Sequence, residues 1–374
     1  MKTETICSML WNHQFIDGTS RVKPCCRFRG SIGTFSNDLD ETFSSYDIDI
    51  IRNDMLAGKR PAGCIRCWQE EDSGKKSLRQ RYNENPELGI NQINFKQPVI
   101  QWLELAISND CNLMCRMCDS RYSHLLFNEE LEFQGKTYSK KKNTKINIDA
   151  IFKYVPYLKH LKITGGEPLI TPDHWKLINY IIETGYAKNI WLNYSTNLTI
   201  FPRKKFIDRW KHFKFVEIAS SFDSCIPEET EYLRYPSKQE DVYKTIGEFL
   251  NLSKTYNIRV QSRPTITILN IYHLPETLEW LYKRNIKFNA THLTYPQFLS
   301  ITILPMKDKL FILDKFNNFK YSDKKVESNC KTIAQHMMNE DNTDLLDRFL
   351  EYTMFLDKKR NQSFKKTYSY YSFV

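Results

Sequence analysis

Three cysteines, Cys111, Cys115 and Cys118, stand at the spacing C-x3-C-x2-C, directly after an apolar run over residues 102–107. Three thiolates on one short loop can bind three irons of a [4Fe-4S] cube and leave the fourth iron without a protein ligand. An open iron can bind a substrate or a cofactor, as open catalytic metal sites do. Two alternatives are a set of buried free cysteines and a zinc knuckle, although zinc needs a fourth ligand and only His124 lies nearby.

A second motif, Gly165-Gly166-Glu167-Pro168, follows another short apolar run that ends at Thr164. Glycines allow the backbone to come close to a ligand. A glutamate can accept hydrogen bonds from an ammonium group. Taken alone, this motif indicates only an ordinary turn between a strand and a helix.

Together and in this order, the two motifs resemble those of the radical SAM enzymes. In that family the open iron chelates the amino and carboxylate groups of S-adenosylmethionine (SAM). Reduction of the cube then cleaves SAM to a 5′-deoxyadenosyl radical that abstracts hydrogen from a substrate, and an electron donor such as flavodoxin or ferredoxin is implied. The implied ligands of this cube, and so the catalytic residues, are Cys111, Cys115 and Cys118. The implied SAM-binding residues are Met117, Gly165, Gly166, Glu167 and Pro168. Met117 departs from the aromatic residue usual in the family, but its apolar, polarisable side chain can fill the same role.

The first part of the chain carries a second group of cysteines. They are Cys7, Cys25, Cys26, Cys64 and Cys67. Four thiolates from three separated segments can close around an iron–sulfur cluster or a zinc ion. The arrangement resembles the auxiliary-cluster modules called SPASM and twitch, as does the stretch over residues 68–79, although the best-known members have the module after the barrel and not before it. The resemblance implies an auxiliary [4Fe-4S] cluster on Cys7, Cys25, Cys64 and Cys67. Cys26 competes with Cys25, because adjacent side chains point in different directions.

Further SAM contacts are implied by position in the family pattern. Three of them lie where expected strands end, and they are Ser195, Asn197 and Ser221. Each is alternatively a turn or cap residue. Arg234 matches an arginine that binds the SAM carboxylate in related enzymes, a contact that a guanidinium can make with two hydrogen bonds. Its alternative is a surface ion pair with Glu229 or Glu231.

The elements that position these residues follow from an alternation of short apolar runs and helix-like stretches, which predicts a parallel sheet with crossover helices. The expected strands are 101–107, 159–164, 189–195, 214–222, 257–267 and 290–296. The expected helices are 147–156, 173–184, 203–211, 239–254 and 275–285. The class is α/β, and six such units fit the partial (βα)6 TIM-like barrel of the family. Chemistry in such barrels gathers at the carboxyl ends of the strands, where both motifs fall.

Three segments are expected in the domain organisation. Residues 1–98 form a twitch-like, cysteine-rich α+β module that ends in a polar linker. Residues 99–300 form the radical SAM partial barrel, and residues 301–374 form a helical extension. That extension contains a helix over 343–360, after which residues 361–374 either dock over the barrel mouth or fray.

Some side chains leave two interpretations open. Gln261, Arg263, Thr265 and Thr267 alternate along the fifth strand and therefore share one face, which either lines the barrel or meets solvent. Cys225 and Cys330 are isolated, which is typical of core thiols. The lysine-rich stretch over residues 136–145 indicates a solvated loop rather than a nucleic-acid contact.

The composition limits the classes of protein that the sequence fits. Of 374 residues, 41% are hydrophobic and 14% aromatic, which is enough for a sizeable core. The sequence has no apolar run long enough for a membrane span and no signal peptide at its start. Ten cysteines without an export signal indicate metal ligands in a reducing cytoplasm. The net charge of +10 comes from scattered lysines, which indicates a soluble surface more than a nucleic-acid partner.

These observations predict a radical SAM enzyme. Because auxiliary-cluster members often modify peptides, a peptide or protein side chain is the expected substrate. A small metabolite, a sugar or a nucleotide is the alternative substrate. The first alternative is a non-catalytic iron–sulfur protein for electron transfer or scaffolding, which would need no SAM pocket. The second is a zinc-stabilised nucleic-acid-binding module, which would bind zinc and show steeply salt-dependent binding.

Overall fold

The structure is a computed structural model of the chain and describes residues 3–72, 74, 76–137 and 144–374. The chain divides into two compact units. The first unit comprises Met1–Asp110, Lys142–Ser195 and Pro202–Glu217, and the second comprises Cys111–Lys141, Thr196–Phe201 and Ile218–Val374. The lysine-rich centre of the stretch 136–145 lies outside the described residues, as do two positions of the stretch 68–79.

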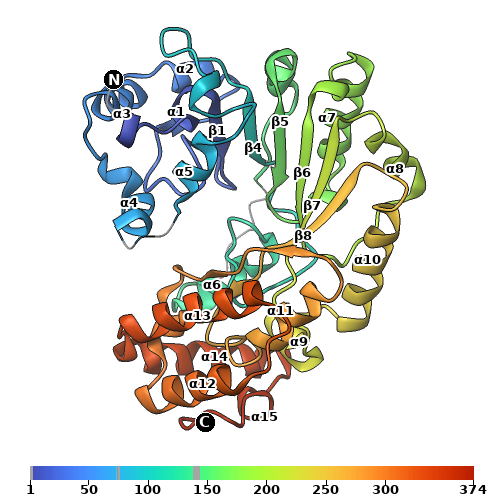
Figure 1. The fold of residues 1–374 in the computed structure, drawn as a ribbon. Helices are drawn as coiled ribbons and strands as arrows, with labels where there is room; N and C mark the ends of the chain where they lie inside the picture. Colours follow the sequence, from blue (N-terminus) through green and yellow to red (C-terminus); the bar gives the residue numbers. More distant parts are fainter. Residues whose placement is uncertain (1–2, 73, 75, 138–143) are drawn as a thin grey trace. The chain divides into compact units, whose positions relative to one another are not determined.

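A largely parallel sheet is the centre of the first unit (Figure 1). Its strands are β1 (His13–Ile16), β2 (Arg21–Lys23), β3 (Gly33–Thr34), β4 (Trp102–Ala106), β5 (His160–Thr164), β6 (Trp191–Thr196) and the start of β7 (Phe215–Ser220). Their order is β3-β2-β1-β4-β5-β6-β7. Strands β1, β4, β5 and β6 pair in parallel, whereas β2 pairs antiparallel with both β1 and β3. The N-terminal cysteine-rich segment thus adds its own strands to the edge of the main sheet.

Helices surround this sheet. Those before β4 are η1 (Thr3–Thr5), α1 (Met9–Asn12), α2 (Asp40–Phe43), α3 (Tyr46–Leu56), η2 (Ala62–Cys64), α4 (Ile65–Asp72), α5 (Leu78–Asn83) and η3 (Ile90–Gln92). Those after it are η5 (Asp149–Tyr157), η6 (Pro168–Ile170), α7 (Pro172–Glu183), η7 (Ala187–Asn189) and α8 (Lys204–Trp210). Tyr194 of β6 contacts His174 of α7 and Trp210 of α8, so one face of the sheet is covered by these two helices.

The second unit is mainly helical. Its helices are η4 (His124–Leu126), α6 (Phe127–Phe133), α9 (Pro227–Leu233), α10 (Gln239–Leu252), α11 (Leu274–Tyr282), η8 (Gln297–Leu299), η9 (Ile301–Ile303), α12 (Met306–Asn318), α13 (Lys324–Asn339), η10 (Thr343–Leu345), α14 (Leu346–Arg360) and α15 (Phe364–Thr367). Its strands are the end of β7, then β8 (Ile258–Ser262), β9 (Thr265–Ile266), β10 (Lys287–Phe288) and β11 (Thr291–His292). β10 pairs in parallel with β8, and β11 with β9.

The predicted α/β class and its parallel sheet are confirmed, although the described residues form no closed barrel. The first four expected strands are found as β4 to β7. The expected fifth strand is interrupted after β8, because Pro264 has no N–H to donate to a neighbouring strand. The sixth was wrongly placed at 290–296, since β10 and β11 cover only 287–288 and 291–292.

Other expectations had mixed outcomes. The expected helix at 147–156 is the 3-10 helix η5, which contains Pro156 and so lacks one backbone donor. The helix over 343–360 is confirmed as η10 and α14, whereas α12 and α13 were expected only as part of the helical extension over 301–374, without bounds of their own. Residues 361–374 dock and do not fray, since Tyr368 and Tyr371 are buried and the Tyr371 hydroxyl donates to the Ile268 carbonyl at 2.6 Å. No helix in the described part of the chain is long and apolar enough to cross a membrane.

Candidate functional site

The loop that carries Cys111, Cys115 and Cys118 belongs to the second unit and has no regular structure. Cys115 is buried, whereas Cys111 and Cys118 are partly exposed. The Cys118 N–H donates to the Cys115 carbonyl at 3.0 Å, which closes a tight turn. Burial raises the pKa of the Cys118 thiol well above its usual value, and the neighbouring Cys115, Asp119 and Cys111 raise it further. The three sulfur atoms therefore share one small region of the loop.

Arg116, between the second and third cysteines, anchors this loop. Its guanidinium is 1% exposed and donates to Asp357 Oδ1 at 2.6 Å and, through Nε, to the Tyr232 carbonyl at 3.0 Å. It also lies over the Tyr232 ring, 3.6 Å from the centroid. Asp357 in turn accepts from the Tyr232 hydroxyl at 2.7 Å and from the Phe364 N–H at 2.5 Å. This role was not predicted, because nothing in the sequence links Arg116 to a carboxylate in α14.

Arg234 lies directly beside the cysteines. Its Nη1 is 3.7 Å from Cys115 Sγ, and its Nε donates to Asp223 Oδ2 at 2.8 Å. The predicted alternative, a surface ion pair with Glu229 or Glu231, is wrong. Glu229 pairs with His273 and Glu231 pairs with Lys238. Arg234 is instead a nearly buried cation held between a thiol and a carboxylate.

Asn197 also meets the cysteine loop. Its Nδ2 donates to Asn112 Oδ1 at 2.9 Å and lies 3.9 Å from Cys111 Sγ. Its Oδ1 accepts from the Thr199 N–H at 2.9 Å, which is the turn role given as the alternative, and its predicted contact with SAM stays a prediction. His124 Nδ1 accepts from the Cys111 N–H at 3.3 Å and is therefore occupied by the backbone of the loop.

The donor set of this loop fits an iron–sulfur cube better than one metal ion. Among the described residues, no three or more His, Cys, Asp or Glu side chains converge closely enough to hold a single ion. In a [4Fe-4S] cube each cysteine binds a different iron, so its sulfurs stand further apart. The three loop cysteines would hold the cube, and no fourth cysteine is adjacent in the sequence.

The Gly-Gly-Glu-Pro motif belongs to the first unit, where it is fastened to the segment that leads into Cys111. The Gly166 N–H donates to the Ser108 carbonyl and the Glu167 N–H to the Asp110 carbonyl, both at 2.8 Å. A Cβ on Gly166 would lie 1.9 Å from the Asp110 oxygen. Gly165 has a φ of +121° and would place a Cβ 2.5 Å from the Ser108 oxygen. Only glycine fits at either position.

The remaining candidate SAM contacts are placed as follows. The Glu167 side chain is fully buried and accepts from the Leu169 N–H at 3.1 Å, so its carboxylate caps the turn that begins at the buried Pro168. Ser195 is partly exposed near the end of β6 in the first unit. Met117 and Ser221 are partly exposed in the second unit, where the Ser221 N–H donates to the Thr196 carbonyl at 2.9 Å. Their predicted contacts with SAM stay predictions.

The N-terminal cysteines form a second group, within the first unit. Burial raises the pKa of Cys25 well above its usual value, and the nearby Cys26, Cys7 and Cys64 add to the effect. Burial also raises the pKa of Cys64 to about 12, with Cys67 contributing. Cys26 differs, because it is exposed whereas Cys25 is only partly exposed. The other N-terminal cysteines influence the Cys25 thiol, and its choice over Cys26 as a ligand stays a prediction.

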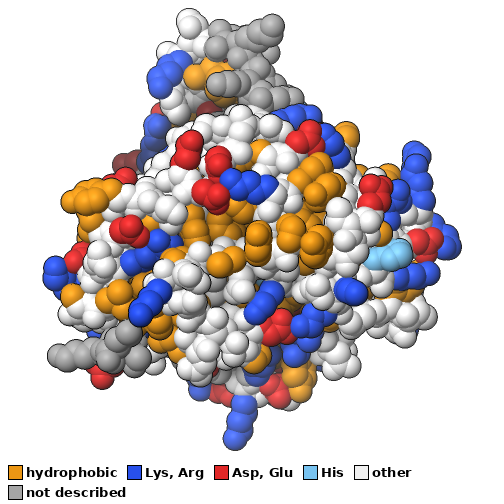
Figure 2. Space-filling view, turned by 90° about the horizontal axis from the view of Figure 1, so that it is seen from above, with side chains coloured by type: hydrophobic (Ala, Val, Ile, Leu, Met, Phe, Trp, Pro, Cys, Tyr) orange, Lys and Arg blue, Asp and Glu red, His pale blue; other side chains and the backbone are white. Residues whose placement is uncertain are grey.

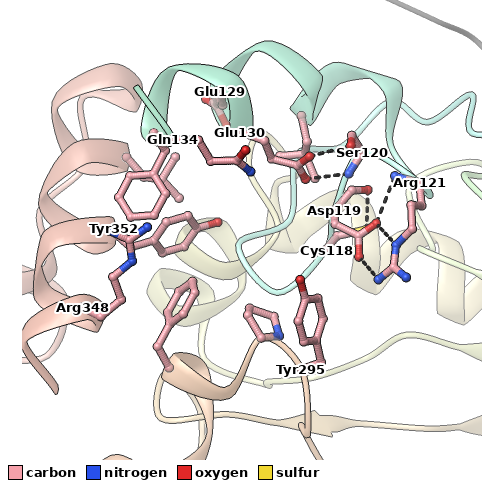
Figure 3. A pocket seen from close by; sticks show the side chains of 15 residues that line it. Cys118, Asp119, Ser120, Arg121, Glu129, Glu130, Gln134, Tyr295, Arg348 and Tyr352 are labelled. Atoms are coloured by element: carbon pink, nitrogen blue, oxygen red, sulfur yellow. Dashed lines mark hydrogen bonds and ion pairs between the residues drawn. The ribbon is translucent and has the colours of Figure 1, made fainter. Parts of the chain in front are cut away.

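A pocket of about 340 Å³ opens beside Cys118 in the second unit (Figure 3). Aromatic side chains line much of it: Phe133, Tyr295, Phe298 and Tyr352. Two polar pairs close one side, since Arg121 Nε donates to Asp119 Oδ1 at 2.8 Å and the Ser120 N–H donates to Glu130 Oε1 at 2.6 Å. This volume lies at the lower end of the range of volumes found for ligand pockets.

The surface charge is mixed. On the face drawn in Figure 2, Lys and Arg are interspersed with Asp and Glu, with no continuous basic stripe on that face.

The chain is similar in sequence to enzymes of one superfamily. The family model described as the radical SAM superfamily matches residues 105–283. A GTP 3′,8-cyclase of Campylobacter lari is 25% identical over 233 residues, which cover 60% of this chain and 66% of that protein. An S-adenosylmethionine-dependent nucleotide dehydratase of Selenomonas ruminantium is 26% identical over 172 residues, which cover 45% of this chain and 57% of that protein. The chain thus spans less than two thirds of these relatives.

Two solved structures align with part of this chain. SuiB of Streptococcus suis, bound to its precursor peptide SuiA, aligns with a TM-score of 0.41 at 12% identity, over 69% of this chain and 60% of that one. The radical S-adenosylmethionine methyltransferase TsrM of Kitasatospora setae aligns with a TM-score of 0.37 at 9% identity, over 50% and 33% of the two chains.

Proposed function

We propose, from the premise that residues 105–283 belong to the radical SAM superfamily, that this enzyme abstracts hydrogen from a peptide or protein side chain. The superfamily uses a [4Fe-4S] cluster and SAM, which together supply the 5′-deoxyadenosyl radical when bound. The single observation that carries the assignment is the cysteine loop, whose three thiols lie on one short segment and can bind three separate irons.

The residues around that loop have distinct tasks in the proposal. Arg116 fixes the loop to α14 through Asp357, which keeps the cysteine side chains in one arrangement. Arg234 places a cation 3.7 Å from Cys115 Sγ, where it stabilises negative charge on a thiolate and can reach a carboxylate of SAM. Gly166 and Glu167 hold the segment that leads into the loop by backbone hydrogen bonds, a close approach that Gly165 and Gly166 allow because neither has a Cβ.

The second cysteine group supports a peptide substrate. Cys7, Cys25, Cys64 and Cys67 would hold an auxiliary [4Fe-4S] cluster, as the twitch-type resemblance implies. Members with such clusters often modify peptides. An external electron donor such as flavodoxin or ferredoxin would reduce the catalytic cluster.

A nucleotide is the second candidate substrate. It is favoured by the names of the two relatives, a GTP 3′,8-cyclase and a nucleotide dehydratase, at 25% and 26% identity. The two candidates differ in charge, because a nucleotide brings phosphates whereas a peptide brings neutral amide groups. The two candidate substrates can therefore be distinguished by testing whether a peptide or a nucleotide increases SAM cleavage.

The decisive experiment is anaerobic. The protein is reconstituted with iron and sulfide, given SAM and dithionite, and assayed for 5′-deoxyadenosine with and without a peptide library or GTP. We expect 5′-deoxyadenosine from the wild type and none from Cys115→Ala, while Cys225→Ala, a thiol outside both cysteine groups, serves as the matched control. A wild type that retains its iron yet never yields 5′-deoxyadenosine under any of these additions would refute the proposal.

A further inference from the structure

Helix α5 fastens the segment that carries Cys7, within the first unit. Its last residue, Asn83, donates from Nδ2 to the Ile6 carbonyl at 2.7 Å and accepts at Oδ1 from the Ser8 N–H at 2.8 Å. These two backbone groups belong to the residues on either side of Cys7. An amide side chain offers both a donor and an acceptor, so asparagine can satisfy both groups at once. Asn83 thus holds the backbone of Cys7 from both sides.

Arg79, one turn earlier on α5, joins the same segment to the helix that carries Cys67. Its Nη1 donates to the Ile6 carbonyl at 2.7 Å, and its guanidinium lies over the Trp68 ring, 4.8 Å from the centroid. Trp68 directly follows Cys67 in α4. Arg79 therefore bridges the sequence neighbours of two N-terminal cysteines.

A buried carboxylate holds Arg79 in this place. Glu71 accepts from Arg79 Nε at 3.0 Å and from Nη2 at 2.6 Å, so the contact is bidentate. The two side chains are only 5% and 9% exposed. Ser77, which caps α5, donates its hydroxyl to the same carboxylate at 2.5 Å. Because the desolvation of two buried ions offsets much of their attraction, stability alone is a poor explanation for this pair.

The charge of Arg79 reaches the cysteine group. Burial raises the pKa of the Cys7 thiol, and the neighbouring Cys64 and Cys67 raise it further, so these three thiols lie near one another. Burial also raises the pKa of Cys64, and Arg79 acts in the opposite sense on both Cys7 and Cys64. A cation in this position stabilises negative charge on the group. The reduction potential of an iron–sulfur cluster depends on such surrounding charges.

We propose that α5 is a clamp for the auxiliary cluster, in which Asn83 positions Cys7 and the Arg79–Glu71 pair sets the reduction potential. The inference rests on the proposed function, since it assumes a cluster on the N-terminal cysteines. Reduction adds one electron to that cluster. A nearby cation therefore favours the reduced form, and a nearby anion favours the oxidised form.

The test isolates the auxiliary cluster. Every protein is the full chain with Cys111→Ala, Cys115→Ala and Cys118→Ala, a background that lacks the ligands of the catalytic cube. After anaerobic reconstitution the iron per chain is counted. The midpoint potential is then measured by titration with dithionite, followed by electron paramagnetic resonance. The background protein should hold about four irons per chain.

The variants have distinct expected results. Asn83→Leu should lower the retained iron at least about twofold, because Cys7 loses both backbone contacts. Arg79→Gln should lower the equilibrium constant for reduction about tenfold, which is about 59 mV for one electron, whereas Glu71→Gln should raise the potential. Arg79→Lys keeps the charge and should stay near the background value. Arg81→Gln, at an exposed position of the same helix, is the matched control and should change neither reading.

The opposite signs expected from Arg79→Gln and Glu71→Gln distinguish an effect of charge from damage to the fold. The inference is overturned if the background binds no iron, if Asn83→Leu retains as much iron as Arg81→Gln, or if the two shifts share a sign or are absent. If Arg79→Gln retains too little iron to titrate, a Glu71→Gln potential at or below the background value overturns it. Formation of 5′-deoxyadenosine by the wild type tests the proposed function separately, because the background has no catalytic cube.

Discussion

Replacing Gly166 with alanine tests whether the Gly-Gly-Glu-Pro backbone holds the segment that leads into Cys111. The new Cβ would stand 1.9 Å from the Asp110 carbonyl oxygen, which is far inside contact distance. Because the clash is with backbone, it is relieved only by separating the two segments. That separation breaks the hydrogen bonds from Gly166 to Ser108 and from Glu167 to Asp110, both 2.8 Å long.

The size of the effect follows from these two bonds. Each contributes about 1 kcal/mol, so the free energy of unfolding should fall by about 2 kcal/mol. For a unit of this size the melting temperature should fall by about 4–8 °C. Asp110 precedes Cys111 directly, so the iron retained per chain after reconstitution should fall as well.

The assay is thermal unfolding of the wild type and the variant, followed by an iron count. Gly247→Ala is the matched control, because a Cβ there meets nothing within 4 Å and alanine is favoured over glycine inside α10 by about 1 kcal/mol. If Gly166→Ala melted at the wild-type temperature and kept its iron, the two segments would not be fastened as described.

Three further changes have defined outcomes. Cys25→Ala should lower the iron content by about four per chain, whereas Cys26→Ala should leave it unchanged, because the other N-terminal cysteines influence the Cys25 thiol while Cys26 is exposed. Asp357→Ala should lower the free energy of unfolding by about 3 kcal/mol, since it leaves the buried Arg116 without its carboxylate partner; calorimetry measures this. His174→Gln should flatten the pH dependence of unfolding between about pH 4 and 6.5, as measured by denaturant titration.

The sign of the last effect follows from burial, which lowers the pKa of His174 to about 3. Between that value and about 6.5 the unfolded chain binds more protons, so this residue lowers the stability by up to about 1.4 kcal/mol for each unit that the pH falls. His212→Gln, at an exposed position, is the control for His174→Gln. Asp347→Ala, at an exposed position of α14, is the control for Asp357→Ala. Equal effects from Asp347→Ala and Asp357→Ala would contradict the anchoring role of Asp357.

Local patterns predicted much of the fold. The apolar runs that became β4 to β7 are buried on both faces, and strands of that kind are recognisable without any tertiary information. Proline explains one of the errors, since Pro264 interrupts a segment whose hydrophobic pattern alone indicated one continuous strand. Helices α12 and α13 were expected only as part of the helical extension, although their buried residues recur at helical spacing.

For the site as well, features that depend on neighbours in sequence were predicted and contacts between distant residues were not. Spacing identified the cysteines and the Gly-Gly-Glu-Pro motif, because their chemistry depends on neighbours in sequence. The contacts that position them join distant residues: Arg116 with Asp357, and Arg234 with Asp223. Nothing local distinguishes these carboxylates from exposed ones.

The central claim is that the cysteine loop holds a cube with one iron open to SAM. The most direct measurement is the electron paramagnetic resonance spectrum of the dithionite-reduced protein, recorded before and after SAM is added. We expect SAM to change the signal of a reduced [4Fe-4S] cluster in the wild type and to have no effect on the spectrum of Cys115→Ala. A wild-type protein with a full iron content whose spectrum is the same with and without SAM would contradict the claim.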